Sequence, residues 1–225
     1  MAIVALQKAS KDYLTDGQRV RALEDVSLEV ERGEFLALVG RSGCGKSTLL
    51  HLAGAMDFPS SGRVLLDGVE TSSLKDAGLT RLRREKVGFI FQSFQLLHTL
   101  TVFENVELPL LLAGKPNARA IAREKLAWVE LDGLGVRYPH QLSGGQMQRV
   151  GIARALVQSP AILLADEPTG NLDTATGNVI LDLLKKLTRE LNTATLMATH
   201  SAEAAALADT LVRLRDGKIE EVAQR

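Results

Sequence analysis

The sequence predicts an α/β fold in which a parallel-sheet core carries an inserted helical lobe and, near the N-terminus, a small antiparallel β section. Short apolar runs typical of strands buried on both faces alternate with stretches of helical periodicity, and this alternation indicates a parallel sheet. Residues 3–6 and 20–30 instead alternate apolar and polar positions, as half-exposed antiparallel strands do. Residues 101–158 have helical character, with 3.6-residue periodicity in residues 118–131 and 147–157.

The elements of the core follow in order along the chain. Apolar runs predict strands at residues 35–39, 87–91, 161–165 and 195–199, and periodicity predicts a helix at residues 174–191. Asp67-Gly68 predicts a turn after a strand at residues 63–67, and Asp216-Gly217 predicts a terminal hairpin of residues 211–214 and 218–222. We expect one domain over residues 1–225, with residues 1–92 and 159–225 as the core and about 93–158 as the helical lobe.

Charge and cysteine content limit the functions open to the chain. Lys plus Arg and Asp plus Glu each number 27, so the basic excess that nucleic-acid binding needs is missing and no nucleic-acid partner is expected. The charged cluster at residues 81–86 is interpreted as a solvated helix face. The single cysteine, Cys44, can form neither an internal disulfide nor a thiolate metal site. No apolar run approaches the roughly 20 residues of a membrane span, so we expect a soluble, cytoplasmic chain.

The most informative motif is Gly40-Arg-Ser-Gly-Cys-Gly-Lys-Ser47, which matches G-x-x-x-x-G-K-[ST] between a predicted strand and a predicted helix. Its glycines let successive backbone N–H groups turn toward a phosphate, and the helix directs its positive end to the same point. Lys46 supplies charge to the terminal phosphates, and Ser47 supplies a hydroxyl suited to Mg²⁺. The motif predicts a site for ATP and Mg²⁺ in a phosphate loop formed by Gly40, Arg41, Ser42, Gly43, Cys44, Gly45, Lys46, Ser47 and Thr48.

Two alternatives apply to this loop. The first is a glycine-rich tight turn before a helix, which the strand–loop–helix context disfavours. The second concerns Cys44, which occupies a variable position of the motif: a catalytic thiol is the alternative to a small tolerated side chain.

A second motif, Leu142-Ser-Gly-Gly-Gln146, opens the predicted helix at residues 147–157. Its structural interpretation, Ser143 as a helix N-cap beside flexible glycines, explains one residue of the five. With this motif the chain resembles the ATP-binding cassette (ABC) ATPases, through nearly its whole length and with the motifs in the family's order. The resemblance implies a P-loop NTPase (RecA-like) core and a signature formed by Leu142, Ser143, Gly144, Gly145 and Gln146.

Further positions match the family's other motifs. The matches are Tyr13 with the aromatic that stacks on adenine, Gln92 with the Q-loop glutamine, Leu163-Leu-Ala-Asp166 with the Walker B strand, Glu167 with the residue that follows it, Gly170-Asn-Leu-Asp173 with the D-loop, and His200 with the switch histidine. In isolation, Asp166-Glu167 would be interpreted as a solvated acidic turn, His200 as a structural histidine and Tyr13 as a packing residue.

The resemblance assigns a role to each match. Ser47, Gln92 and Asp166 are the expected Mg²⁺ ligands, Asp166 through a water. Glu167 is the expected general base for the attacking water. His200, on the carboxyl edge of the sheet, is expected to contact the γ-phosphate together with Lys46.

The resemblance also implies two copies. In the family, the helical lobe presents its signature to the γ-phosphate bound by a second subunit. Ser143, the Gly145 N–H and a helix N-terminus together form an anion site that suits this role. We therefore expect a homodimer or pseudo-dimer with two sandwiched nucleotides.

A transport role is the last implication of the resemblance. Residues 92–112, which begin with Gln92 and end with Leu112, are similar to the part of transporter cassettes that receives a separate transmembrane permease, although simple lobe core is an alternative. Residues 168–173 are similar to the branch that serves macrolide and peptide export, lipoprotein release and cell division. The chain is therefore expected to be peripheral on the cytosolic face of the cell membrane. A cytosolic regulator that uses ATP-driven dimerisation without transport is the alternative.

Overall fold

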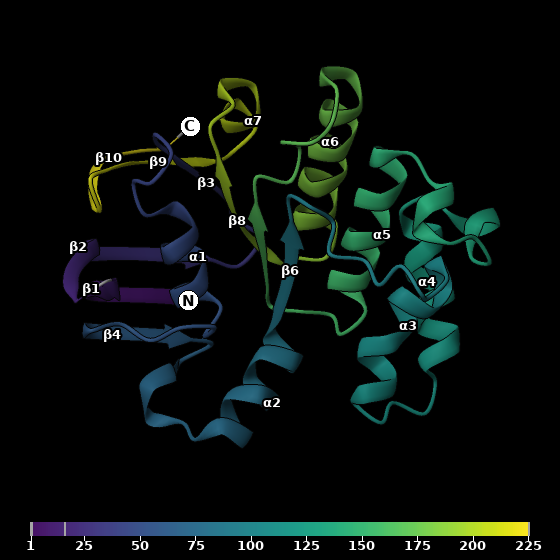
Figure 1. The fold of residues 1–225 in the computed structure, drawn as a ribbon, viewed down its shortest axis with the longest axis horizontal. Coiled ribbons are helices and arrows are strands. Elements are labelled where there is room, and N and C mark those ends of the chain that lie inside the picture. The colour runs from purple at the N-terminus through teal and green to yellow at the C-terminus, as the bar shows by residue number, and fades with distance from the viewer. Residues whose placement is uncertain (1, 16, 225) are drawn as a thin grey trace.

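The computed structural model describes residues 2–15 and 17–224, and within them it contains two sheets (Figure 1). A four-stranded antiparallel sheet has the order β2-β1-β4-β5, and a six-stranded sheet has the order β10-β9-β3-β8-β7-β6. The strands are β1 (Ala2–Thr15), β2 (Gln18–Glu31), β3 (Phe35–Val39), β4 (Ser61–Leu66), β5 (Val69–Glu70), β6 (Val87–Phe91), β7 (Ile162–Asp166), β8 (Ala194–Thr199), β9 (Thr210–Arg215) and β10 (Lys218–Gln224).

The helices lie between these strands in the chain. They are α1 (Lys46–Ala53), α2 (Asp76–Lys86), α3 (Val102–Leu112), α4 (Ala118–Trp128), α5 (Gly144–Leu156), α6 (Thr174–Glu190) and α7 (Ala202–Ala206), with short 3₁₀ turns at Thr71–Ser73, Asp132–Leu134 and Pro139–Gln141. Helices α3, α4 and α5 pack on one another beyond the six-stranded sheet, on the side away from the antiparallel sheet (Figure 1). Among the described residues, none of these helices has the length and apolar content that a bilayer crossing requires.

The centre of the six-stranded sheet confirms the predicted α/β fold. Strands β3, β8, β7 and β6 pair in parallel, β9 pairs in parallel with β3, and β10 returns antiparallel at the edge. Alternate residues of β3 enter two different apolar cores. Phe35 and Ala37 face the core under α3 to α6, whereas Leu36 and Leu38 face the core shared with α1 and the antiparallel sheet. Both faces are therefore buried, which is why the run is continuously apolar.

The N-terminal strands are longer than the sequence predicts. The predicted strands at residues 3–6 and 20–30 become the fourteen-residue strands β1 and β2. The β1–β2 ladder shifts register at Leu6/Ala9, Ala9/Lys11 and Lys11/Asp12. Each irregularity breaks the two-residue alternation on which the prediction depended, so the second half of β1 has no visible strand pattern.

The helix predicted at residues 118–131 is shorter than expected. Helix α4 ends at Trp128, and Glu130 adopts a left-handed conformation with φ of 59°. Val129 and Leu131 are nevertheless fully buried, so the apolar periodicity continues past the point where the helix ends. At the start of α5 the difference is in the other direction, since the helix begins at Gly144 rather than at residue 147.

Candidate functional site

The phosphate loop connects β3 to α1 and passes close to the end of β9, at Leu214. Gly45 is the N-cap of α1 and has φ of 107°, a conformation that side chains other than glycine's rarely adopt. Gly40 is required for space: a Cβ there would lie 2.4 Å from the Leu214 carbonyl oxygen and 2.6 Å from Cys44 Sγ. The glycines of the motif therefore allow the loop to turn tightly and to pack against β9.

Lys46 is buried and its ammonium lies inside the loop. Nζ donates hydrogen bonds to the carbonyl oxygens of Gly40 at 2.8 Å and of Arg41 at 3.1 Å. Only 6% of the residue is exposed. A positive charge thus stands at the N-terminus of α1, where the helix dipole also favours an anion.

Sheet register brings the other candidate residues to the same edge. Phe91 pairs with Asp166, Asp166 with Ala198, and Val39 with Thr199. Because these strands are parallel, the residues that follow them meet at one carboxyl edge. The residues at this edge are Gln92 after β6, Asp166 and Glu167 at the end of β7, His200 after β8, and the phosphate loop after β3.

Glu167 and His200 are in contact. Glu167 Oε2 lies 3.0 Å from His200 Nδ1, and the side chains are 24% and 67% exposed. Glu167 has φ of 46°, and its backbone N–H donates to the Ala198 carbonyl oxygen at 2.9 Å. This costly backbone conformation, held by a bond to β8, directs the carboxylate toward the histidine rather than back into the sheet.

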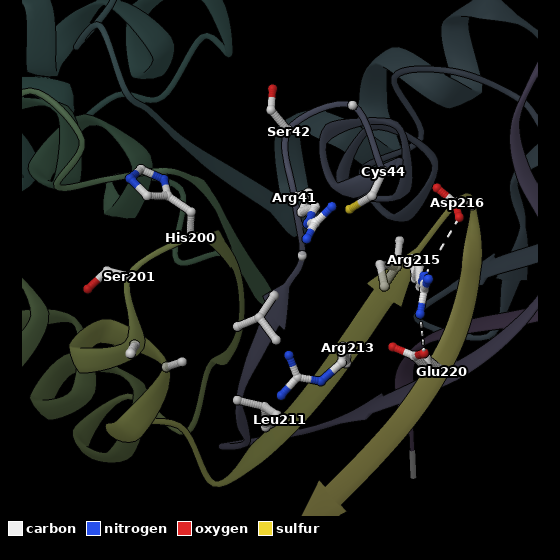
Figure 2. A pocket seen from close by; sticks show the side chains of 16 residues that line it. Arg41, Ser42, Cys44, His200, Ser201, Leu211, Arg213, Arg215, Asp216 and Glu220 are labelled. Atoms are coloured by element: carbon white, nitrogen blue, oxygen red, sulfur yellow. Dashed lines mark hydrogen bonds and ion pairs between the residues drawn. The ribbon is translucent and has the colours of Figure 1, made fainter.

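A cavity of about 850 Å³ lies between the phosphate loop, the start of α7 and the hairpin of β9 and β10. Figure 2 shows Cys44 Sγ and the Arg41 side chain pointing into it, with His200 at one end and Arg213 and Arg215 at the other. Ser42 and Gly43 also line it, whereas Lys46, Asp166 and Glu167 do not. A smaller cavity of about 270 Å³ joins Glu167 and His200 to the D-loop, residues 170–173.

Tyr13 lies on β1 close to the end of the phosphate loop. Its hydroxyl donates to Asp57 Oδ2 at 3.0 Å, and Lys11 Nζ lies 5.0 Å from the ring centroid. Burial, and then the bond to Asp57, raises the pKa of Tyr13, while a bond with Thr48 acts in the opposite direction. The residue is 36% exposed, so part of its side chain is open to solvent beside the loop.

The signature is anchored within its own chain. Ser143 Oγ accepts from the Gln146 N–H at 3.3 Å, and Gln146 Oε1 accepts from the Ser143 N–H at 3.0 Å, which is a capping box for α5. A Cβ on Gly144 would lie 3.1 Å from Leu172, and one on Gly145 would lie 2.4 Å from Thr176 Cγ2. Leu142 packs on the apolar core. Capping and packing within the chain therefore account for more of this motif than Ser143 alone.

Asp173 ends the D-loop as the N-cap of α6. Its Oδ1 accepts from the Thr176 N–H at 3.0 Å, and its Oδ2 accepts from the Thr176 hydroxyl at 2.6 Å. The hydroxyl first, and then the backbone N–H, hold the pKa of this carboxyl below its usual value. Ser201, the residue after His200, caps α7 in the same way, because its hydroxyl oxygen accepts from the Ala204 N–H.

Two residues that sequence reasoning missed hold the Q-loop, residues 92–95. Asn171 Nδ2 donates to the Gln92 carbonyl oxygen at 3.0 Å, and Arg154 Nη2 donates to the Phe94 carbonyl oxygen at 2.9 Å. Arg154 Nη1 also donates to the Gln95 carbonyl oxygen. Asn171 lies inside the quoted D-loop motif, which was a usable signal, whereas nothing in the sequence around Arg154 indicated its partners.

The expected cation ligands are all oxygen donors. Ser47 has a hydroxyl, Gln92 an amide oxygen and Asp166 a carboxylate at the end of β7. This set fits Mg²⁺, which prefers hard oxygen ligands and takes its others from phosphates and water. Across residues 2–15 and 17–224, no group of three or more His, Cys, Asp or Glu side chains could hold a metal ion alone.

A glycine-rich loop after the central parallel strand β3, with an acidic pair at the same sheet edge after β7, two strands away in the sheet, defines a P-loop protein that binds nucleoside triphosphates. The chain belongs to the ABC transporter family, whose model matches residues 23–170. This confirms the family that the motifs predicted, and with it ATP binding and the activity of an ABC-type ATPase.

Three members of the family illustrate how similar this chain is to known proteins. The lipoprotein-releasing system ATP-binding protein LolD of Bordetella avium is 44% identical, over 97% of this chain and 96% of its own length. The macrolide export ATP-binding/permease protein MacB of Aggregatibacter actinomycetemcomitans is 43% identical over 97% of this chain, which spans 34% of that longer protein. The solved dimeric structure of the ATP-binding cassette MJ0796 in a post-hydrolysis state, with ADP and Pi, has a TM-score of 0.90 and 41% identity over 98% of both chains.

Proposed function

We propose that the chain is the ATP-hydrolysing subunit of a transport complex of the lipoprotein-releasing or macrolide-exporting kind, and that two copies hydrolyse ATP between them. The observation that carries the proposal is the 3.0 Å contact of Glu167 with His200, on the sheet edge that also carries the phosphate loop. The names of the relatives at 43–44% identity and the dimeric MJ0796 cassette support it.

Nucleotide binding is assigned to three groups of residues. Tyr13 offers a ring face for adenine, because one third of the residue is exposed beside Thr48. The phosphate loop, residues 40–48, holds the phosphates, with the Lys46 ammonium at its centre. Ser47, Gln92 and Asp166 are the oxygen donors that would hold Mg²⁺, which neutralises phosphate charge when it is bound.

Hydrolysis is assigned to Glu167 and His200. The Glu167 carboxylate accepts a proton from the water that attacks the γ-phosphate, and ADP and phosphate are the products. His200 is 67% exposed, so its ring can contact the γ-phosphate while Nδ1 remains beside Glu167. Lys46 stabilises the negative charge that develops on the transferred group.

The second half of each site is assigned to the partner's signature. Ser143 Oγ already accepts from the Gln146 N–H, so the hydroxyl proton remains available for a phosphate oxygen. The N-terminus of α5 directs its dipole toward the same ligand. On this basis the helical lobe, about residues 93–158, serves the partner's nucleotide, whereas the core of residues 1–92 and 159–225 holds its own.

Permease docking is assigned to the surface at residues 92–112. Three large apolar side chains are exposed there: Leu97 at 48%, Leu111 at 56% and Leu112 at 69%. Leu111 and Leu112 are consecutive at the end of α3, and adjoining exposed apolar side chains are typical of a contact surface. A separate membrane permease seated on them would place the chain on the cytosolic face of the membrane as a peripheral subunit.

The proposal is tested with Glu167→Gln, which keeps the side-chain volume but cannot accept the proton. We expect this variant to bind ATP and to dimerise when it does so, while phosphate release falls by about 10²- to 10⁴-fold. Light scattering after size exclusion measures the dimer, and a phosphate-release assay measures turnover.

Two further variants serve as references in that experiment. Lys46→Ala should show neither the ATP-dependent dimer nor turnover, because it removes the charge inside the phosphate loop. Glu85→Gln, an exposed carboxyl on α2 paired with Arg81, should behave as the unchanged chain does. Undiminished turnover of Glu167→Gln would show that Glu167 is not the base.

A further inference from the structure

The side chain of Gln92 is held by the D-loop of the same chain. Gln92 Nε2 donates to Asn171 Oδ1 at 3.5 Å, and Asn171 Nδ2 donates in return to the Gln92 backbone carbonyl oxygen at 3.0 Å. The Asn171 amide is therefore bonded to both the side chain and the backbone of Gln92, and these two contacts join the residue after β6 to the loop after β7. Both residues are exposed, so core packing does not force this contact.

The neighbouring glycine makes room for the pair. A Cβ on Gly170 would lie 2.6 Å from Gln92 Nε2 and 3.1 Å from its Cδ. Any other residue at position 170 would displace the Gln92 side chain. Gly170 thus leaves space for the Gln92 side chain, and Asn171 accepts a hydrogen bond from it.

The pairing determines which atom of Gln92 is left for a cation. A glutamine amide has one oxygen, which can ligate Mg²⁺, and one nitrogen, which cannot. In this structure the nitrogen is given to Asn171. The amide is therefore oriented so that its oxygen is not taken up by the contact with the D-loop.

We propose that Asn171 is a positioning residue for Gln92, and that its two amide contacts set the orientation in which Gln92 presents its oxygen to Mg²⁺. This inference rests on the proposed function, in which Gln92 is a cation ligand. Outer partners that orient a ligating side chain have large effects on metal affinity although they do not touch the metal.

The experiment is a double-mutant cycle in the Glu167→Gln background, where bound nucleotide is not consumed. Asn171→Leu, Gln92→Ala and the double variant are titrated with Mg²⁺, and the fluorescence of a labelled ATP analogue reports binding. We expect Asn171→Leu to raise the Mg²⁺ concentration at half-maximal binding by about tenfold. Because Asn171 acts through Gln92, the double variant should not exceed Gln92→Ala alone.

A second readout separates positioning from general damage. With Glu167 present, Asn171→Leu should raise the Mg²⁺ requirement of ATP hydrolysis more than it lowers kcat at saturating Mg²⁺. Leucine has the same number of side-chain heavy atoms and the same branching as asparagine, the position is exposed, and thermal unfolding checks the fold. Asn117→Leu is the matched control, because Asn117 is exposed and makes no side-chain bond at the start of α4.

Three outcomes would overturn the inference. An unchanged Mg²⁺ titration for Asn171→Leu, with Gln92→Ala shifted, would remove the role of Asn171 and leave the cation role of Gln92 intact. Effects of the two substitutions that multiply in the double variant would show that Asn171 acts independently of Gln92. A Gln92→Ala variant with an unshifted titration would overturn both this inference and the proposed cation site.

Discussion

The signature glycines are constrained by their own chain as well as by any partner. Gly145 has no room for a methyl group, because Thr176 Cγ2 lies 2.4 Å from where its Cβ would stand. Thr176 is in turn fixed by two hydrogen bonds from its N–H and hydroxyl to Asp173. A loss of activity on substitution of Gly145 therefore has two possible sources, the packing in this chain and the anion site offered to the other.

Replacement of Gly145 by alanine separates these sources. Alanine gains about 1 kcal/mol of helix propensity, but the overlap with Thr176 costs about 1–3 kcal/mol. We expect Gly145→Ala to lower the free energy of unfolding, as measured by urea denaturation. Adding Thr176→Ser, which removes Cγ2 and keeps the hydroxyl, should restore stability.

Thr176→Ser alone is the control for that experiment. If the double variant is stable but does not hydrolyse ATP, the methyl group blocks the anion site itself. A double variant as unstable as Gly145→Ala would refute the packing explanation.

At the scale of elements, two side chains of α5 donate hydrogen bonds to the backbone of the Q-loop and of the residue before it. Gln148 Nε2 donates to the Phe91 carbonyl oxygen at 3.4 Å, and Arg154 donates to the carbonyl oxygens of Phe94 and Gln95. Phe94 and Gln95 both have left-handed backbones, with φ of 61° and 50°. Such conformations cost about 1–2 kcal/mol each in residues other than glycine, so the guanidinium offsets strain that the loop would otherwise release.

Loss of Arg154 should therefore loosen the Q-loop. Arg154→Met keeps most of the apolar side chain but removes both hydrogen bonds, each worth about 1.5–3 kcal/mol because the donor is charged. We expect a lower free energy of unfolding, and faster amide hydrogen exchange in residues 93–97 measured by mass spectrometry. Arg123→Met, on the exposed face of α4, is the control and should leave that exchange unchanged. Equal exchange in both variants would contradict the role given to Arg154.

The elements also show what the sequence could and could not predict. Strands β3 and β6 were predictable to the residue because each is an uninterrupted run without a charged or strongly polar side chain. In β3 this follows from burial on both faces, whereas in β6 only Gly88 and Ile90 are buried and the other residues are half-buried. The bulged half of β1 was not, because register shifts remove the alternation. The sheet-edge residues were predictable from motifs at strand ends, whereas the partners of Gln92 and Phe94 depend on how α5 and the D-loop pack, which periodicity does not encode.

At the scale of the whole molecule, the proposed function gives each chain a part in two different sites. Its sheet edge carries the phosphate loop, Glu167 and His200, while its signature lies at the start of α5. In the proposed head-to-tail pair these two parts serve different nucleotides. Damage to one part of a chain should therefore leave the other part able to serve its partner.

Mixing two inactive variants tests that division. Lys46→Ala damages the phosphate loop, and Ser143→Arg damages the signature, so each should lack ATP hydrolysis alone. In an equal mixture, each mixed dimer has one intact site, formed by the phosphate loop of the Ser143→Arg chain and the signature of the Lys46→Ala chain. We expect the mixture to hydrolyse ATP in a phosphate-release assay, although neither variant does so alone, with an upper bound of about half of the unchanged chain's activity because half of the sites are intact when every chain is in a mixed dimer.

The control for that experiment is thermal unfolding of Ser143→Arg, since Ser143 also caps α5 and loss of a cap costs about 1 kcal/mol. A mixture that stays as inactive as its folded components would contradict the division of each site between two chains.

Strand β10 is the end strand of the six-stranded sheet, and its side chains affect the tendency of the chain to aggregate at high concentration. An end strand exposes backbone groups that can add a strand from another molecule, and charged side chains discourage such stacking. On β10, Glu221 and Glu220 pair with Arg213 and Arg215 of β9. In the proposed head-to-tail pair these charges have a consequence, because open-ended strand addition at β10 would compete with dimerisation and lead to aggregates.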